Sequence, residues 1–289
     1  MATGCQVVPE YDIGRQYRVL EALGPTEVPV PHVYGFEPDE RLLGAPFFVM
    51  ERIDGEIPPD APTYHMAGWL TEASPEERER LWWSGVEALA AVHRLDWKAL
   101  GLDFLEAAGR GATPVERQLD YYGRYLEWAS PGRREPLIEA ALAWLVRHRP
   151  AGPEPLRLCW GDSRLGNMIF REFRCVAVLD WEMAVLASPE QDLAWWLFFD
   201  RHHSEGCDVP RLGGFPSREE TVERYRKRTG IDPKHLEYYE VFAAVRFSVI
   251  MIRVGQHLKQ AGVLPDDSDF ETNNSATKML ARLLGLPPP

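Results

Sequence analysis

Apolar residues near the start of the chain recur at helical spacing. Ile13, Tyr17 and Leu20 fall on one face of a helix, and a Gly-Pro pair then ends the pattern as helix stop signals do. Two runs rich in β-branched and aromatic residues follow, at 33–36 and 46–52, each bounded by Gly or Pro. We therefore expect one short helix and then two strands that pair through the intervening turn.

The pattern becomes strongly helical beyond three prolines between residues 58 and 62. Ser74 with Glu77 forms a capping box, and Thr113 with Glu116 repeats this helix start signal. Further helices are expected through Leu137 and Leu145, at 192–199, at 217–228, at 235–257, and in a last segment ending near Leu286. The prolines divide the chain into a small first lobe, 1–57, and a larger, mostly helical second lobe, 58–289.

Composition is that of a folded globular protein, with 45% hydrophobic and 26% charged residues. The 44 acidic residues outnumber the 32 basic ones, and no basic stripe is present, so we expect no nucleic-acid partner. The longest apolar run, 241–254, is interrupted by Arg246 and Arg253 and is shorter than a membrane span, so we expect a buried helix and no membrane association. Four cysteines without CxxC spacing, and no signal-peptide pattern, indicate a cytoplasmic protein with reduced thiols.

The distinctive chemistry lies between residues 156 and 182. A strand ending at Trp160 is followed by the sequence GDSRLGN, a short apolar run, a polar turn, and a second apolar run that ends in DWE. If residues 173 and 174 centre the turn of an antiparallel hairpin, Asn167 lies opposite Asp180. Asp162, five residues before Asn167, can reach the same place.

Two carboxylates and one amide oxygen are hard ligands that suit Mg²⁺ carrying a phosphate, and do not suit zinc. Phosphoryl transfer needs such ligands, together with a carboxylate that accepts the proton of the acceptor hydroxyl. The D-x-x-x-x-N spacing also matches the catalytic loop of protein kinases. Taken singly, Asp162 could hold an Asx turn, Asn167 a left-handed turn and Asp180 a helix N-cap. The three together favour phosphotransfer.

WGDSRLGN followed by VLDWE resembles the motifs of the aminoglycoside phosphotransferase (APH) family. The resemblance implies an α+β, protein-kinase-like fold: a small N-terminal β lobe with one helix, and a larger, mostly helical C-terminal lobe that carries the catalytic loop and a β-hairpin. It implies ATP and Mg²⁺ as cofactors. Asp162 would be the catalytic base, Asn167 and Asp180 the Mg²⁺ ligands, and Arg164 a phosphate-contacting residue.

Other segments extend the resemblance from about residue 11 to about residue 196. GAPFFVMERIDG is similar to the family's strand and hinge, so the backbone groups of Glu51 and Ile53 would face adenine, with Met50 beside the pocket. The segment SPEQDLAWW is similar to the family's motif in which Asp192 would anchor the catalytic loop. Trp160 takes the place of the family's usual histidine, which we interpret as a packing variation.

Several conspicuous side chains have a simpler structural interpretation. His93 lies on the apolar face of a capped helix, where a hydrogen-bonded core histidine is expected. The aromatic run at 195–199 is expected to be core rather than the roof of a pocket. His202 and His203, with Glu205 and Asp208, are expected in a solvated turn rather than a metal site.

The chain departs from the resembled pattern before residue 50. Kinase-like first lobes carry a Gly-rich turn over the phosphates and a strand lysine paired with a helix glutamate. Here the first lysine is Lys98, and the glutamate position is occupied by Gln16. Truncation is the explanation we favour, with another way of holding ATP and loss of activity as alternatives. The apolar faces of the opening helix and strands would then be exposed or buried in a homo-oligomer.

The sequence therefore predicts a kinase: an ATP- and Mg²⁺-dependent phosphotransferase acting on a hydroxyl of a small-molecule substrate. Its first lobe would be a partial nucleotide-binding lobe and hinge, and its second lobe would carry catalysis and the substrate. One alternative is a kinase of hydroxyacyl thioesters, because the motif also resembles the kinase-like domain fused to some acyl-CoA dehydrogenases. The other is an inactive pseudokinase that serves as a binding module.

Overall fold

The computed structural model describes residues 6–152 and 155–289. By its internal contacts the chain forms two compact units, which are described separately. One unit comprises residues 12–106 and 155–234 and contains every site residue predicted above. The other comprises residues 1–11, 107–154 and 235–289. The predicted boundary between residues 57 and 58 concerns lobes rather than these compact units, and it stays a prediction.

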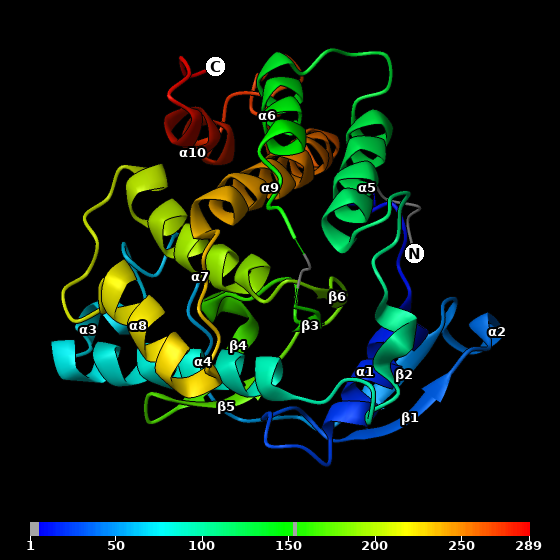
Figure 1. Ribbon diagram of the computed structural model, residues 1–289, viewed down its shortest axis with the longest axis vertical. Coiled ribbons are helices and arrows are strands. Elements are labelled where there is room, and N and C mark those ends of the chain that lie inside the picture. The colour runs from blue at the N-terminus through cyan, green and yellow to red at the C-terminus, as the bar shows by residue number, and fades with distance from the viewer. Residues whose placement is uncertain (1–5, 153–154) are drawn as a thin grey trace. The chain divides into compact units, whose positions relative to one another are not determined.

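The unit with the site begins with the predicted helix and strand pair (Figure 1). Helix α1 (Ile13–Leu23) packs on the antiparallel strands β1 (Val33–Glu37) and β2 (Phe47–Met50), and α2 (Glu40–Leu43) lies in their connection. Tyr17 of α1 stacks on Phe36 of β1 with ring centroids 5.7 Å apart. The prediction of one helix followed by paired strands is confirmed.

The expected apolar exposure in this region is only partly confirmed. On the strand pair, Tyr34, Val49 and Met50 are exposed. The apolar face of α1, in contrast, is buried through Val19 and Leu20. This face packs against β1 and β2 of the same unit, so it does not need a further surface to cover it.

Helix α4 (Pro75–Arg94) begins at the predicted capping box, in which Ser74 and Glu77 exchange hydrogen bonds. It packs against α8 (Arg218–Thr229), and the Trp82 indole N–H donates to the Thr221 hydroxyl at 2.9 Å. The short helix α3 (Trp69–Glu72) precedes it. The unit also contains turns of 3-10 helix, among them Leu102–Leu105 and Glu205–Cys207.

Two small antiparallel pairs flank the loop that carries Asp162. Strand β3 (Arg157–Cys159) pairs with β6 (Val185–Ala187), and β4 (Met168–Arg171) pairs with β5 (Arg174–Val178). The β4–β5 hairpin turns at Glu172 and Phe173, which both have positive φ, as a tight two-residue hairpin turn requires. The register predicted from a turn at residues 173 and 174 is therefore wrong: Met168 faces Val178, and a bulge follows Ile169.

Helix α7 (Glu190–His203) is longer than the segment 192–199 that we expected, and it is buried on nearly all sides. The expectation that His202 and His203 lie in a solvated turn is wrong, because both are buried in its last turn. Burial lowers the pKa of each imidazole to about 3, since the charged form would lose its hydration.

The second unit is a group of helices: α5 (Pro114–Ala129), α6 (Pro136–Arg147), α9 (Leu236–Gln260) and α10 (Ser275–Leu284). Within it, α9 contacts each of the other three helices. By length and hydropathy α9 could cross a membrane, yet more than half of its most apolar window is buried inside the protein. Such burial is what a core helix shows, as predicted for residues 241–254.

Candidate active site

The loop after β3 carries Asp162, and its path depends on Gly161. This glycine has φ of +94°, a conformation that side chains disfavour. A Cβ atom there would lie only 2.1 Å from the backbone oxygen of Met183. Gly161 therefore lets the loop pass directly against the segment that follows Asp180.

Three side chains donate hydrogen bonds to the Asp162 carboxylate. Asn167 Nδ2 donates to Oδ2 at 2.6 Å, and Trp195 Nε1 of α7 donates to Oδ1 at 2.7 Å. Arg164 Nε lies 3.1 Å from both oxygens. The carboxylate is thus fixed in orientation from three directions while its side chain stays partly exposed, as a group that receives a proton from a ligand must be.

Asn167 ends a 3-10 turn (Leu165–Asn167) that leads into β4. Its Nδ2 donates both to the Asp162 carboxylate and to the Asp162 backbone oxygen, the latter at 3.1 Å. Because the amide nitrogen faces Asp162, the amide oxygen is the atom available to a cation. The backbone oxygen of Asn167 accepts from Leu179 N at 2.9 Å, which brings the start of the hairpin beside the residue before Asp180.

Asp180 has φ of +58°, a left-handed conformation that aspartate tolerates better than most residues. Trp160 Nε1 donates to the backbone oxygens of Leu179 and Asp180 at 2.8 and 3.0 Å. The interpretation of Trp160 as a packing variation is therefore incomplete, since its indole also holds the strand end that presents Asp180. Arg15 of α1 donates to the backbone oxygen of Ala184 at 2.8 Å and ties the opening helix to this segment.

Electrostatics link the carboxylates of this region. Burial, and then the negative charge of Asp162, raise the pKa of Asp180 above its ordinary value. Burial, Asp180 and Asp162 together raise the pKa of Glu182 to about 7. Sequence reasoning assigned no role to Glu182, although it is the last residue of the DWE motif. Its shifted pKa was not visible from the sequence, because it depends on carboxylates that meet only in the fold.

This donor set fits a divalent cation such as Mg²⁺. The ligand atoms would be carboxylate oxygens and the Asn167 amide oxygen, which hard cations prefer. Burial is the largest cause of the raised pKa values of Asp180 and Glu182, and repulsion among the carboxylates adds to it; a cation between them would relieve that repulsion.

Asp192, at the start of α7, lies beneath the loop as expected. Its carboxylate accepts from the backbone N–H groups of Trp160 and Gly161 at 2.6 and 2.9 Å, and from His93 Nε2 at 3.2 Å. His93 Nδ1 in turn lies 2.6 Å from the Tyr225 hydroxyl. His93 is therefore a hydrogen-bonded core histidine, as predicted. Cys159 lies close enough for a three-residue metal cluster, but the Asp192 oxygens and both His93 nitrogens already have protein partners.

Comparison with known proteins identifies the family of the chain. A family model described as the phosphotransferase enzyme family, APH, matches residues 10–227, well over half of the chain. The chain belongs to the APH phosphotransferase family. Its fold is accordingly the α+β, protein-kinase-like fold of that family, in which helices predominate over strands and the strands form small antiparallel pairs.

The curated relatives are much longer than this APH-family chain. Acyl-CoA dehydrogenase family member 11 of Rattus norvegicus is 32% identical over 245 residues, which cover 82% of this chain and 30% of the relative. Acyl-CoA dehydrogenase family member 10 of Mus musculus is 29% identical over 260 residues, covering 86% of this chain and 23% of that relative. The chain thus spans less than a third of the length of either protein.

Solved structures show the same fold. A candidate aminoglycoside phosphotransferase from Ralstonia eutropha JMP134 has a TM-score of 0.71 and 25% identity, covering 94% of this chain and 80% of that one. The GDP complex of aminoglycoside 2′-phosphotransferase-IIIa has a TM-score of 0.59 and 13% identity, with coverage of 94% and 81%. A mutant APH(4)-Ia with ADP and hygromycin B has a TM-score of 0.54 and 16% identity, with coverage of 94% and 83%. Structural relatives therefore bind nucleotides.

The predicted hinge residues of the APH-family chain lie directly after β2. Met50 and Glu51 are exposed, and Ile53 is half-buried. Glu51 N donates to the backbone oxygen of His32 at 2.7 Å, so this N–H belongs to the strand pairing. The backbone groups of these residues that could meet adenine are therefore the Glu51 carbonyl and the Ile53 N–H. Their contact with a nucleotide remains a prediction.

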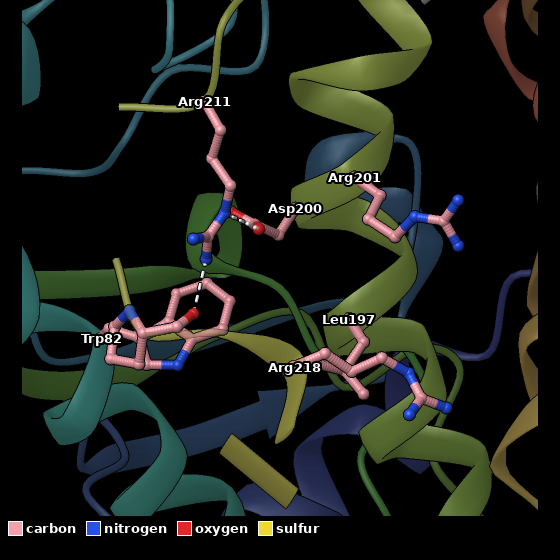
Figure 2. Close-up of a pocket in the computed structure, with 7 residues that line it drawn as sticks. Trp82, Leu197, Asp200, Arg201, Arg211 and Arg218 are labelled. Atoms are coloured by element: carbon pink, nitrogen blue, oxygen red, sulfur yellow. Dashed lines mark hydrogen bonds and ion pairs between the residues drawn. The ribbon is translucent and has the colours of Figure 1, made fainter. Parts of the chain in front are cut away.

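A separate pocket of about 180 Å³ lies on α7, lined in part by Leu197, Asp200 and Arg201 (Figure 2). Helical spacing puts these residues on the face of α7 opposite Trp195, so the pocket is distinct from the surroundings of Asp162. Figure 2 shows Arg211 directed at Asp200, to which its Nε donates at 2.6 Å. Burial opposes ionisation of Asp200, but its hydrogen bond with His65 and the charge of Arg211 hold its pKa below the ordinary value.

Proposed function

We propose that this chain transfers the terminal phosphoryl group of ATP, in a Mg²⁺-dependent reaction, to a hydroxyl of a small molecule. The observation that carries the proposal is the contact between Asn167 Nδ2 and the Asp162 carboxylate, 2.6 Å long, beside the electrostatically coupled Asp180. Membership of the APH phosphotransferase family supports the reaction class. The proposal also covers the class of molecule that accepts the phosphoryl group.

In this mechanism Asp162 accepts the proton of the acceptor hydroxyl as its oxygen attacks the γ-phosphorus of ATP, while the bond from that phosphorus to the bridging oxygen breaks and ADP leaves. Trp195 and Asn167 hold the carboxylate in one orientation, so that it need not reorient when the hydroxyl arrives. Asn167 and Asp180 would hold Mg²⁺. When bound, the cation neutralises the phosphate charges and orients the transferred group.

The adenine base would bind at the hinge. The Glu51 carbonyl would accept from the adenine amino group and the Ile53 N–H would donate to a ring nitrogen, with Met50 packed against the base. The structural relatives with bound GDP and ADP support a purine nucleotide as the donor. Competition between ATP and GTP for the native chain, measured by isothermal titration calorimetry, distinguishes the two purines.

A second acceptor class is favoured by the curated relatives. Both are named acyl-CoA dehydrogenases, and the aligned region covers more than four fifths of this chain. A hydroxyacyl thioester would offer a hydroxyl of the kind that the proposed reaction needs. On this view the chain is a hydroxyacyl-thioester kinase, whereas the structural relatives favour a sugar hydroxyl such as those of aminoglycosides.

Transfer of radiolabelled phosphate from ATP tests the proposal. Native protein and Asp162→Asn are each incubated with Mg²⁺ and an acceptor panel of 3-hydroxyacyl-CoA thioesters of several chain lengths and aminoglycosides. We expect labelled product from the native chain with one acceptor class, and a loss of at least about 100-fold in Asp162→Asn. Nucleotide binding without transfer to any acceptor would contradict the proposal and favour the pseudokinase alternative.

A further inference from the structure

Arg164 lies between two carboxylates of the same unit. Its Nε faces Asp162, and its Nη1 forms a short ion pair with Asp60 Oδ2. The guanidinium also lies over the ring of Phe199, 5.5 Å from its centroid. Burial alone would lower the pKa of Arg164, but the two carboxylates raise it above its ordinary value, so the side chain stays a cation.

The pairing of Arg164 with Asp162 is unusual for an arginine and a carboxylate. Such pairs commonly form two parallel hydrogen bonds from two nitrogens to two oxygens. Here a single nitrogen, Nε, is 3.1 Å from both Asp162 oxygens, while Nη1 is directed to Asp60. In the described part of the chain, Nη2 makes no hydrogen bond to either carboxylate.

The space around this ion pair is tight. A Cβ atom on Gly166 would lie 2.5 Å from Arg164 Nη1 and 2.6 Å from Asp60 Oδ1. His203 Nε2 also lies 3.5 Å from Asp60 Oδ1. Burial holds the pKa of His203 at about 3, so the imidazole is neutral near pH 7 and Arg164 is the cation that faces Asp60. Asp60 itself is 42% exposed and follows the hinge along the chain.

We infer that Asp60 is a positioning residue: by holding Arg164 Nη1 it prevents Arg164 from closing a two-bond fork on Asp162. Arg164 then shares only its Nε with the two Asp162 oxygens, so these oxygens are less occupied than a two-bond fork would leave them and can accept from the acceptor hydroxyl. This inference rests on the proposed phosphotransferase function. It also links the segment after the hinge to the catalytic loop through one ion pair.

The first test needs no turnover. The indole N–H of Trp195 donates to Asp162 Oδ1, so its signal responds when the other hydrogen bonds to that carboxylate change. Its proton–nitrogen correlation signal is identified by its loss in Trp195→Phe. We expect this signal to move in Asp60→Asn, because Arg164 turns onto Asp162, and also in Gly166→Ala, where the added methyl group separates Arg164 from Asp60.

Asp54→Asn is the matched control. Asp54 lies six residues before Asp60 and pairs with Arg52 at 3.4 Å, with both side chains mostly exposed. Its substitution removes the same charge from the same segment without touching Arg164, so the Trp195 signal should stay at the native position. An unmoved signal in both Asp60→Asn and Gly166→Ala would overturn the inference.

Kinetics provide the second test. Asp60→Asn should lower kcat by about 10-fold with the KM for ATP nearly unchanged, since misorientation affects the transfer step rather than nucleotide binding. Asp60→Glu, which restores the charge, should recover part of the loss. A moved indole signal with native kcat would overturn the catalytic part of the inference. A native chain without transfer activity would refute the proposed function, and the indole comparison would still decide whether Asp60 holds Arg164 away from Asp162.

Discussion

The indole N–H of Trp195 donates a hydrogen bond to Asp162 Oδ1 at 2.7 Å. Trp195 lies in the first half of α7, and Asp192 of the same helix accepts the backbone N–H groups of Trp160 and Gly161. One helix therefore fixes both the backbone of the loop after β3 and the side chain of Asp162. Because α7 is buried on nearly all sides, this support is rigid.

Replacing Trp195 by Phe tests this support. The ring still fills the core, but the donor to Asp162 is lost. A hydrogen bond to a charged group contributes about 1.5–3 kcal/mol, so we expect kcat to fall by about 10-fold or more. Trp196→Phe is the control, because the buried Trp196 Nε1 has no hydrogen-bond partner among the described residues. Equal kcat values for the two variants, measured at saturating ATP, would contradict a role for the Trp195 donor.

Gly161→Ala should destabilise the protein. The new methyl group would meet the backbone oxygen of Met183, and the positive φ of Gly161 would strain an alanine. We expect the free energy of unfolding to fall by about 2–4 kcal/mol, measured by urea denaturation. Gly123→Ala is the comparison, since this glycine lies within α5 with open space around it, and alanine should there stabilise the helix by up to about 1 kcal/mol. A neutral Gly161→Ala would show that the loop does not need this close approach.

The raised pKa of Glu182 predicts that, in the absence of Mg²⁺, the free energy of unfolding depends on pH. Its pKa is raised from 4.5 to about 7 in the folded protein, so folding takes up a proton between these values. The contribution of this group to the free energy of unfolding is therefore greatest below pH 4.5 and is lost as the pH rises through 7. Glu182→Gln should gain stability relative to the native chain between pH 5 and pH 8. Thermal unfolding of both proteins in EDTA measures the difference, and a difference that stays constant with pH would contradict the coupling.

Much of the fold could be predicted because local signals agree with tertiary contacts. The capping box at Ser74 and the strand pair after the first helix follow from short-range patterns that the fold preserves. The convergence of Asn167 with Asp162 could be predicted from the D-x-x-x-x-N spacing, because a single loop brings the two together.

Other features depend on contacts between distant parts of the chain. The turn at Glu172 and Phe173 has no Gly or Asn to mark it, so the hairpin register predicted from the sequence was wrong. A solvated turn is expected for His202 if the helix ends at residue 199, yet the helix continues to His203 and its packing buries His202. Asp60 is 104 residues from Arg164 along the chain, and no pattern in the sequence connects them.

A crystal structure of the native chain with Mn²⁺ and a non-hydrolysable ATP analogue tests the central claim most directly. The account predicts an anomalous peak within about 2.2 Å of Asn167 Oδ1 and of an Asp180 carboxylate oxygen, with Asp162 directed at the γ-phosphate. Asp180→Asn keeps the left-handed backbone and should lose the peak. A metal peak that lies away from Asn167 and Asp180, or one that survives unchanged in Asp180→Asn, would contradict it.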